Sequence, residues 1–419
     1  MKVTTTAVAA RPELVLRTEL MISRVLRGGV LLSIAIIGLG IADFFFLRFA
    51  GRLPDATFPD SLATLMTGLR LAQPLAIASL GLMVLLATPV LRVAVSIPAF
   101  AIEGDWTYVR ITTLVLAILL FSIFAVGDWM SHPGVSAVQG ASLGFFFAVL
   151  LSSLFAGFVG ALVGLGGGVF VVPILTLVFH VPFAAAIGAS IVSVIATSSG
   201  AAAAYVKDHL TNLRVGMFLE IATTSGAICG ALLTTVLDPT ILFIVFGAVL
   251  VISALPLVFR LGEELPQNVH QHPWAVALRL NGTYPDRRLQ REVAYNVDRV
   301  PTGFGIMWLA GALSGLLGIG SGTFKVLALD TAMRLPMKVS TTTSNFMIGV
   351  TAAASAGIFF QQGDIDPVIA APVALGVLAG ATLGALSLTR MSNRRLRKVF
   401  VPVVLLVAAN MLARGFGLI

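Results

Sequence analysis

The chain has 419 residues, of which 58% are hydrophobic and 11% are charged, and its formal net charge is +8. This composition leaves too little polar surface for a soluble globule of this length, so it predicts an all-α polytopic membrane protein. The basic residues lie in short loops between apolar segments, as topology signals do, which argues against nucleic-acid binding. The single cysteine, Cys229, excludes a disulfide framework.

Three apolar runs near the start of the chain predict three transmembrane helices, at residues 28–46, 71–93 and 111–126. Each comes near the roughly 20 residues that cross a bilayer core. The basic tail before them is expected in the cytoplasm by the positive-inside rule. Residues 88–110, which include Arg92, are expected to form a cytoplasmic interfacial segment. We assign residues 1–127 to this N-terminal three-helix module.

The rest of the chain contains an internal duplication. The sequence AGFVGALVGLGGGVFVVPIL at residues 156–175 recurs as AGALSGLLGIGSGTFKVLAL at residues 310–329, and the same register continues without a gap beyond both segments. The apolar runs of each copy predict five membrane segments. Each copy also has a glycine-rich break inside a long apolar run. Paired interruptions of this kind point to a transporter's binding site. We assign the two repeats to residues 140–260 and 301–419.

Loop charges predict that the repeats are inverted. The turn after the third segment is basic in the first repeat, with Lys207 and Arg214, and acidic in the second, with Asp364 and Asp366. Because basic loops stay in the cytoplasm, the two equivalent turns are expected on opposite sides of the membrane. The sequence therefore predicts an inverted repeat of five segments each, in the cell's inner membrane, with a cytoplasmic N-terminus.

Residues 261–300 separate the repeats and are expected in the cytoplasm. The stretch is polar, and residues 274–279 and 291–297 flank an Asn281-Gly282 pair. This pattern predicts a small β-hairpin that turns at the pair.

Two resemblances follow from these motifs. The openings GALVGLGGGVFVVPIL and GLLGIGSGTFKVLAL, each followed by a helix rich in alanine, serine and threonine, resemble the TauE/SafE family of sulfite and organosulfonate exporters over about residues 143–412. This resemblance implies secondary transport of small anions, usually outward. The N-terminal module resembles a family of small membrane proteins and gains no function from it; the residues concerned are Thr88, Pro89, Arg92, Phe100, Asp105, Trp106 and Tyr108.

The breaks themselves predict an anion site. Residues 168–180 span only about 20 Å at 1.5 Å per residue, so they are expected to form a half-helix that begins inside the bilayer. The first N–H groups of such a helix are unpaired and carry about half a positive charge, and glycines let a ligand approach them. Close helix packing is the alternative role of these glycines. The candidate positions are Gly166, Gly167, Gly168, Gly320, Ser321, Gly322 and Thr323.

Lys325 is the most specific candidate among the side chains. It lies three positions after Gly322, where the first repeat has Val171. A charge in the membrane costs about 3 kcal/mol unless it has a partner, and a bound anion would be such a partner. The alternatives are snorkelling and a salt bridge to Asp330, which is also a candidate for taking up a coupling proton.

Polar side chains on the third segments can complete the site, because hydroxyls and amides donate to oxyanions without a fixed charge. They are Ser190, Thr197, Ser344, Asn345 and Thr351. Membrane serines and threonines also bond to their own helix backbone, which is the competing interpretation. Glu220 is a second candidate for coupling to a proton or ion, although nearby Arg214 offers it a simple ion pair.

The sequence has no catalytic constellation beside these residues. It lacks a set of nucleophile, histidine and carboxylate, an aspartate-rich metal motif and a nucleotide-binding loop. We therefore expect no enzyme activity, no metal and no cofactor. The expected partners are the bilayer, a small anionic substrate and a coupling proton or ion, while uptake instead of export and a homo-oligomer stay open. A membrane scaffold or sensor is the alternative class, but it needs neither Lys325 nor paired breaks.

The inversion is open to a labelling test in a chain whose native Cys229 is replaced by serine. Cysteines placed at the equivalent positions Asp208 and Gln362 are expected to react with an impermeant thiol reagent from opposite sides of the membrane. Labelling of both from the same side would contradict the inversion.

Overall fold

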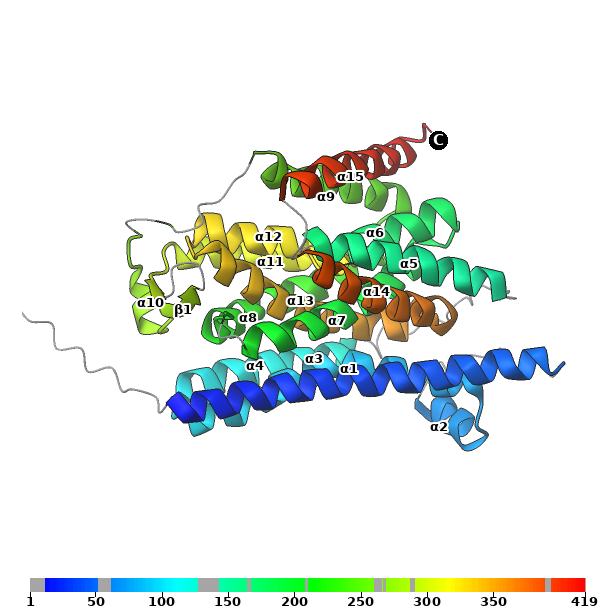
Figure 1. Cartoon of the computed structure of the whole chain (residues 1–419), viewed down its shortest axis with the longest axis horizontal. Coiled ribbons are helices and arrows are strands. Elements are labelled where there is room, and N and C mark those ends of the chain that lie inside the picture. The colour runs from blue at the N-terminus through cyan, green and yellow to red at the C-terminus, as the bar shows by residue number, and fades with distance from the viewer. Residues whose placement is uncertain are drawn as a thin grey trace, which may run out of the picture.

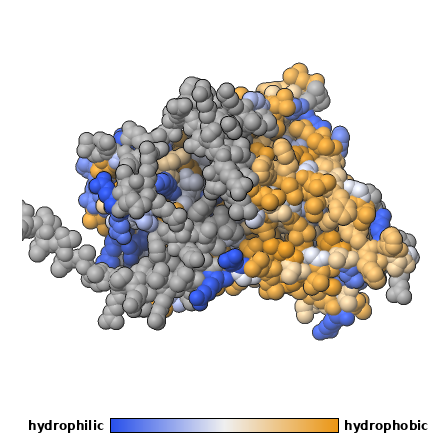
Figure 2. Space-filling model, in the orientation of Figure 1, coloured by the Kyte–Doolittle hydropathy of each residue, from blue (hydrophilic) through white to orange (hydrophobic). Residues whose placement is uncertain are grey.

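The structure is a computed structural model of the chain, and it describes residues 12–51, 62–126, 143–163, 167–207, 210–259, 266, 269–286, 291–388 and 393–418. Helices dominate this part of the chain, which confirms the all-α fold class. Eight of the described helices are long and apolar enough to cross a membrane. The protein is therefore a multi-pass membrane protein, and apolar residues cover a broad part of the face in Figure 2.

The N-terminal module packs three long helices together along one edge of the molecule (Figure 1). They are α1 (Pro12–Phe49), α3 (Pro74–Ile102) and α4 (Trp106–Phe121), with the short α2 (Leu62–Arg70) before α3 and the π-helical η1 (Ser122–Val126) after α4.

The prediction of an interfacial segment at residues 88–110 is wrong for residues 88–102, which belong to helix α3. Helix α3 continues through Pro89 and Pro98 to Ile102, and Arg92 is fully buried inside it. Prolines are tolerated in membrane helices because neighbouring groups satisfy the freed carbonyls. The turn to α4 is confined to the three residues around Gly104, whose φ of 73° is a left-handed conformation that suits glycine.

The two repeats have matching elements. The first contains α5 (Leu143–Val163), α6 (Gly168–Pro173), η2 (Ile174–Val178), α7 (Phe183–Lys207), α8 (Leu213–Thr234) and α9 (Pro239–Phe259). The second contains α11 (Val300–Leu317), α12 (Gly322–Leu327), η3 (Ala328–Ala332), α13 (Met337–Gln361), α14 (Pro367–Leu388) and α15 (Asn393–Gly415). The register of the sequence duplication places Gly168 on Gly322 and Phe183 on Met337, so both copies fold in the same way.

The copies are inverted, because the equivalent helices α7 and α13 run in opposite directions. Near the start of α7, Gly188 packs on the backbone carbonyl of Asp364, which follows the end of α13. Near the start of α13, the Thr342 hydroxyl donates to the carbonyl of Leu210, which follows the end of α7, at 2.7 Å. Each helix therefore begins where its counterpart ends, as the loop charges predict.

Glycines join the repeats through two helix pairs that each combine one helix from either copy. Gly380 and Gly384 of α14 pack on the backbone of α5 at Leu154 and Phe158. Gly226 and Gly230 of α8 pack in the same order on α11. In both pairs the contacts advance together along the two chains, so the helices are parallel and almost touch along their backbones.

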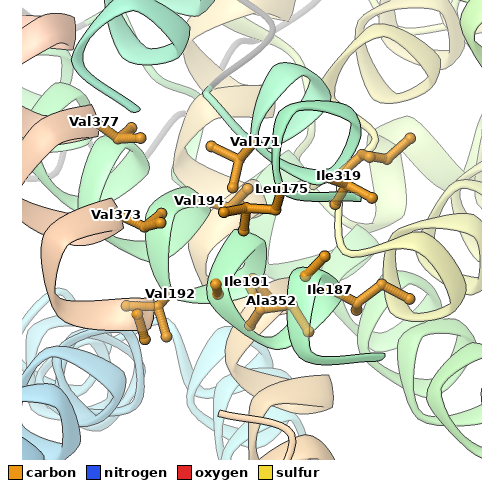
Figure 3. Close-up of a cluster of buried hydrophobic side chains, with 14 of the residues drawn as sticks. Val171, Leu175, Ile187, Ile191, Val192, Val194, Ile319, Ala352, Val373 and Val377 are labelled. Atoms are coloured by element: carbon orange, nitrogen blue, oxygen red, sulfur yellow. The ribbon is translucent and has the colours of Figure 1, made fainter. Parts of the chain in front are cut away.

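The centre of the molecule is apolar and lies between the breaks and the long helices α7 and α13. Figure 3 shows Val171 and Leu175 beside Val194 of α7, Ile319 of the second break and Val373 of α14. Helices α9 and α15 pack on each other at the edge opposite α1 (Figure 1). The core therefore holds both breaks between elements of both repeats.

The stretch between the repeats contains the predicted hairpin, but with a different first strand. Strand β1 (Gly282–Asp286) pairs antiparallel with β2 (Arg291–Tyr295), with Gly282 opposite Tyr295. The Asn281-Gly282 pair thus starts the first strand and is not the hairpin turn. Residues 273–277 form the short helix α10 (Pro273–Ala277), where Pro273 takes a first-turn position that needs no N–H donor.

The glycine contacts predict a position-specific effect of added methyl groups. Gly380→Ala is expected to lower the thermal unfolding temperature, because its Cβ would collide with the backbone of Leu154, and overpacking costs roughly 1–3 kcal/mol. Gly305→Ala in α11 is the matched control: no atom lies within 4 Å of its added Cβ, and alanine favours the helix by about 1 kcal/mol. Equal unfolding temperatures for the two variants would contradict the close pairing.

Candidate functional site

The two breaks meet in the core. The Ser190 hydroxyl of α7 lies 3.2 Å from the carbonyl oxygen of Gly168 in its own repeat and 2.7 Å from that of Gly318 in the other repeat. A Cβ added to Gly168 would lie 3.1 Å from the same Gly318 oxygen. The glycines are therefore needed for the close approach of the two breaks.

The second break is a tight left-handed turn. Gly318 and Gly320 have φ values of 67° and 70°, and Ser321 between them and α12 has a φ of 43°. The Ser321 hydroxyl donates to the carbonyl of Ala310 in α11. A non-glycine residue with positive φ is strained, and such strain is concentrated at functional sites.

Equivalent serines of the two repeats each contact a backbone carbonyl at the start of a half-helix. Ser344 of α13 donates to the Gly322 carbonyl at 3.2 Å, as its counterpart Ser190 donates to Gly168. A serine hydroxyl has one proton to donate. In this conformation both serines use it to hold the breaks in place, which makes them positioning residues.

The other candidates from the breaks and the third segments differ in burial. Gly167, Gly168, Gly320 and Gly322 are buried, whereas Thr323 and Asn345 are half-buried. Thr197 donates to the carbonyls of its own helix α7. Gly166 lies outside the described residues.

Lys325 lies in a buried polar cluster that joins three helices. Its side chain is fully buried on α12, and Nζ donates to Thr351 Oγ1 of α13 at 2.6 Å. Thr351 Oγ1 is 3.4 Å from Oε2 of Glu220, a fully buried acid of α8, and that oxygen also accepts from Thr223 at 2.9 Å. The Thr351 hydroxyl thus lies between the ammonium and the carboxylate.

Glu220 belongs to this cluster. It does not form the ion pair with Arg214 that their closeness in the sequence suggests. Arg214 instead contacts Asp105 of the N-terminal module at 3.1 Å. The second Glu220 oxygen, Oε1, has no hydrogen-bond partner among the described residues. Asp330, on η3, is 8% exposed. Lys325 donates to Thr351, and its charge interacts with those of Glu220 and Arg92.

Arg92 also belongs to this cluster, although the sequence pattern predicts it at the membrane interface. Its side chain is fully buried, Nη2 donates to the Phe346 carbonyl of α13 at 2.5 Å, and the guanidinium lies 4.1 Å from the centre of the Phe346 ring. It attracts Glu220 and repels Lys325. The available sequence signal was its position in an apolar stretch after Thr88 and Pro89, where a cation is costly.

The polar cluster has no counterpart in the other half of the core. The duplication places Val171 on Lys325 and Ala374 on Glu220, and both of these residues are buried and apolar. Figure 3 shows Val171 among other aliphatic side chains. The scaffold is therefore two-fold symmetric, whereas the pair Lys325 and Glu220 occurs in one half only.

A cavity of about 250 Å³ lies between the N-terminal module and α13, and Arg92, Glu220 and Lys325 do not line it. It is lined by α3, α4, η1 and α13, and its walls are apolar apart from Gln361. Such a lining does not suit an oxyanion, so we do not assign the substrate to it.

Burial changes the pKa of three groups in the loops outside the membrane-spanning helices. It raises the pKa of both Asp364 and Asp366 to about 6, and for Asp366 a hydrogen bond from the Val368 N–H partly opposes that effect. In the hairpin, burial raises the pKa of Tyr295 to about 12. The two aspartates lie between α13 and α14, and Tyr295 lies on strand β2.

A comparison with family models decides the membership of the chain. Residues 149–411, well over half of the chain, match the model described as Sulfite exporter TauE/SafE. The chain belongs to this family. Residues 22–124 match a second model, described as a protein of unknown function (DUF1634). Both resemblances expected from the sequence motifs are thereby confirmed.

Curated relatives of the family core are named as transporters. The chain is 25% identical over 277 residues to the probable membrane transporter protein YunE of Bacillus subtilis, covering 64% of this chain and 98% of the relative. It is 28% identical over 240 residues to the probable membrane transporter protein YdhB of the same organism, covering 57% and 88%. A probable membrane transporter protein of Xylella fastidiosa is 26% identical over 265 residues, covering 62% and 92%. No solved structure matches the chain.

Family and relatives together indicate a membrane transporter and not an enzyme. The matches cover 98% of YunE and 88% of YdhB but only 64% and 57% of this chain, so this chain is longer than both relatives.

Proposed function

We propose that the protein is a secondary transporter that exports small anions, such as sulfite or organosulfonates, across the inner membrane. The observation that carries the proposal is the fully buried Lys325, which directly follows the second break and donates to Thr351. A small oxyanion that loses its water needs a cation and hydroxyl donors in return. The name of the family supplies the substrate class.

The substrate would bind where α12 begins, between α8 and α13. There it would contact the Lys325 ammonium and the backbone of the second break around Gly320 and Gly322. Thr323 of α12 and Asn345 of α13, both half-buried, are further donors on these elements. Ser190 and Ser344 would act indirectly: Ser190 bonds to the break of the other repeat at Gly318, and Ser344 holds the start of α12 at Gly322.

Alternating access fits the inverted repeat. When two copies of one fold are related by inversion, rocking of one part against the other opens a central site to either side. The left-handed turn at Gly318, Gly320 and Ser321 offers a point where the chain can bend without breaking a long helix. Export is favoured by the membrane potential, since an anion gains about 2.3 kcal/mol per charge for each 100 mV when it leaves a negative interior.

Replacement of Lys325 tests the site. Lys325→Ala is expected to weaken the binding of sulfite and methanesulfonate by about 10- to 100-fold, because a hydrogen bond to a charged group contributes roughly 1.5–3 kcal/mol. Lys325→Arg should restore only part of the affinity, since the broader guanidinium fits differently. The measurements are anion binding to purified protein and anion flux in proteoliposomes, with inward and outward gradients to separate export from uptake.

Lys338→Ala is the matched control, because Lys338 is an exposed lysine of the same repeat. It should bind and transport as the parent does. If Lys325→Ala binds and transports anions as well as Lys338→Ala does, the proposed site is wrong.

Glu220 is the coupling candidate, because its carboxylate competes with an anion for the same partners. Glu220 Oε2 and Lys325 Nζ both contact the Thr351 hydroxyl. An anion that reaches Lys325 is repelled by ionised Glu220 in this buried site, and protonation of Glu220 relieves that repulsion. The binding of an anion at Lys325 would therefore be coupled to the uptake of a proton at Glu220.

Glu220→Gln tests this coupling while keeping an amide of the same shape. Methanesulfonate, which stays ionised, should bind the parent more tightly below neutral pH than above it. In Glu220→Gln binding should be tighter, by roughly tenfold above neutral pH, because the competing charge is gone. Glu292→Gln on the exposed strand β2 serves as the control. Equal affinities of Glu220→Gln and Glu292→Gln above neutral pH would refute the role of Glu220.

A further inference from the structure

The N-terminal module reaches into the transporter core at one basic side chain. Arg92 lies midway along α3, and its guanidinium stacks on the ring of Phe346, a residue of α13 only five positions from Thr351. The side chain is fully buried. A charged guanidinium in such a place is costly unless other groups compensate for it.

The compensation described for Arg92 is incomplete. Of its three nitrogens, Nη2 donates to the Phe346 carbonyl, whereas Nε and Nη1 have no hydrogen-bond partner among the described residues. These two nitrogens carry three of the five N–H donors of a guanidinium. Leaving buried donors unpaired is unfavourable, and a hydrogen-bond acceptor beside the guanidinium would satisfy them.

The charges point to the same kind of ligand. Two cations reach the same part of α13: Arg92 bonds to Phe346, and Lys325 bonds to Thr351, which the buried acid Glu220 also contacts. Among these three groups the net charge is therefore positive. An anion bound between the two cations would neutralise the excess and accept hydrogen bonds from the free guanidinium donors.

The module is held firmly enough to place Arg92 in this way. At one end of α4, Asp105 contacts Arg214 of α8 at 3.1 Å, and the Tyr108 hydroxyl donates to the Leu278 carbonyl beside α10 at 2.7 Å. Beyond the other end of α4, Ser122 of η1 donates to the carbonyl of Ala354 in α13. The contacts at both ends fix the module to the repeat helices that form the site.

We propose that Arg92 is an anion-binding residue, contributed by the N-terminal module to the transport site formed by the repeats. The proposal rests on the proposed function, since it takes the substrate at Lys325 to be an anion. It gives the module a direct part in substrate binding. It also predicts that Arg92 favours doubly charged anions, because each added ligand charge gains the same attraction again.

The test compares a monoanion with a dianion on the full chain. Arg92→Met keeps much of the side-chain volume and removes a costly buried charge, so it is expected to fold. Methanesulfonate should bind this variant roughly tenfold more weakly than the parent. Thiosulfate should lose about the square of that factor, because the Coulomb energy is proportional to the ligand's charge. Titration calorimetry on purified protein measures both affinities.

Two further variants separate binding from a purely structural role. Arg110→Gln, an exposed arginine on α4 of the same module, should leave both affinities unchanged. Arg92→Lys keeps the charge without the planar fork, so it should weaken both anions by a similar factor and preserve their ratio. It also provides the decisive comparison if Arg92→Met does not yield folded protein.

The outcomes distinguish this proposal from the one on which it rests. If the parent binds neither anion, the proposed function fails and the role of Arg92 fails with it. If the parent binds both and Lys325→Ala does not, but Arg92→Met behaves like Arg110→Gln or weakens both anions equally, then only the role of Arg92 is wrong. Loss of the dianion preference in Arg92→Lys would overturn it as well.

Discussion

The organisation of this protein depends on the cost of keeping charges where no water can reach them. Lys325, Glu220 and Arg92 come from three separate helices and are all fully buried. None of them would be stable there alone, and the Thr351 hydroxyl lies between the first two. The packing of α3, α8, α12 and α13 therefore has to position these side chains precisely.

Symmetry provides the scaffold and asymmetry provides the chemistry. The inverted copies pack glycine against backbone in the same way on both sides of the molecule, and Ser190 and Ser344 hold the two breaks by equivalent bonds. The pair Lys325 and Glu220 occurs in one half only, since Val171 and Ala374 occupy the equivalent positions. A duplicated fold can acquire a specific site by changing a few residues in one copy only.

The fold was largely predictable from the sequence, because a repeated register and the loop charges are local signals. The pairing of α5 with α14 and of α8 with α11 was not, since it depends on contacts between residues far apart in the chain. Lys325 stood out as an isolated charge. Arg92 did not, because prolines beside it are typical of a helix end in soluble proteins, whereas a membrane helix continues through them. The link from Glu220 to Lys325 needed the position of Thr351.

The parallel pairs across the repeats also constrain how such a chain could have arisen. Each pair combines one helix from either copy, so a protein made of a single repeat would leave the glycine faces of its first and fourth segments without a partner. In such an ancestor, these helices would have had to pack against those of a second molecule inserted in the membrane in the opposite orientation. Fusion of the two genes would then have fixed both orientations in one chain and freed either half to change alone.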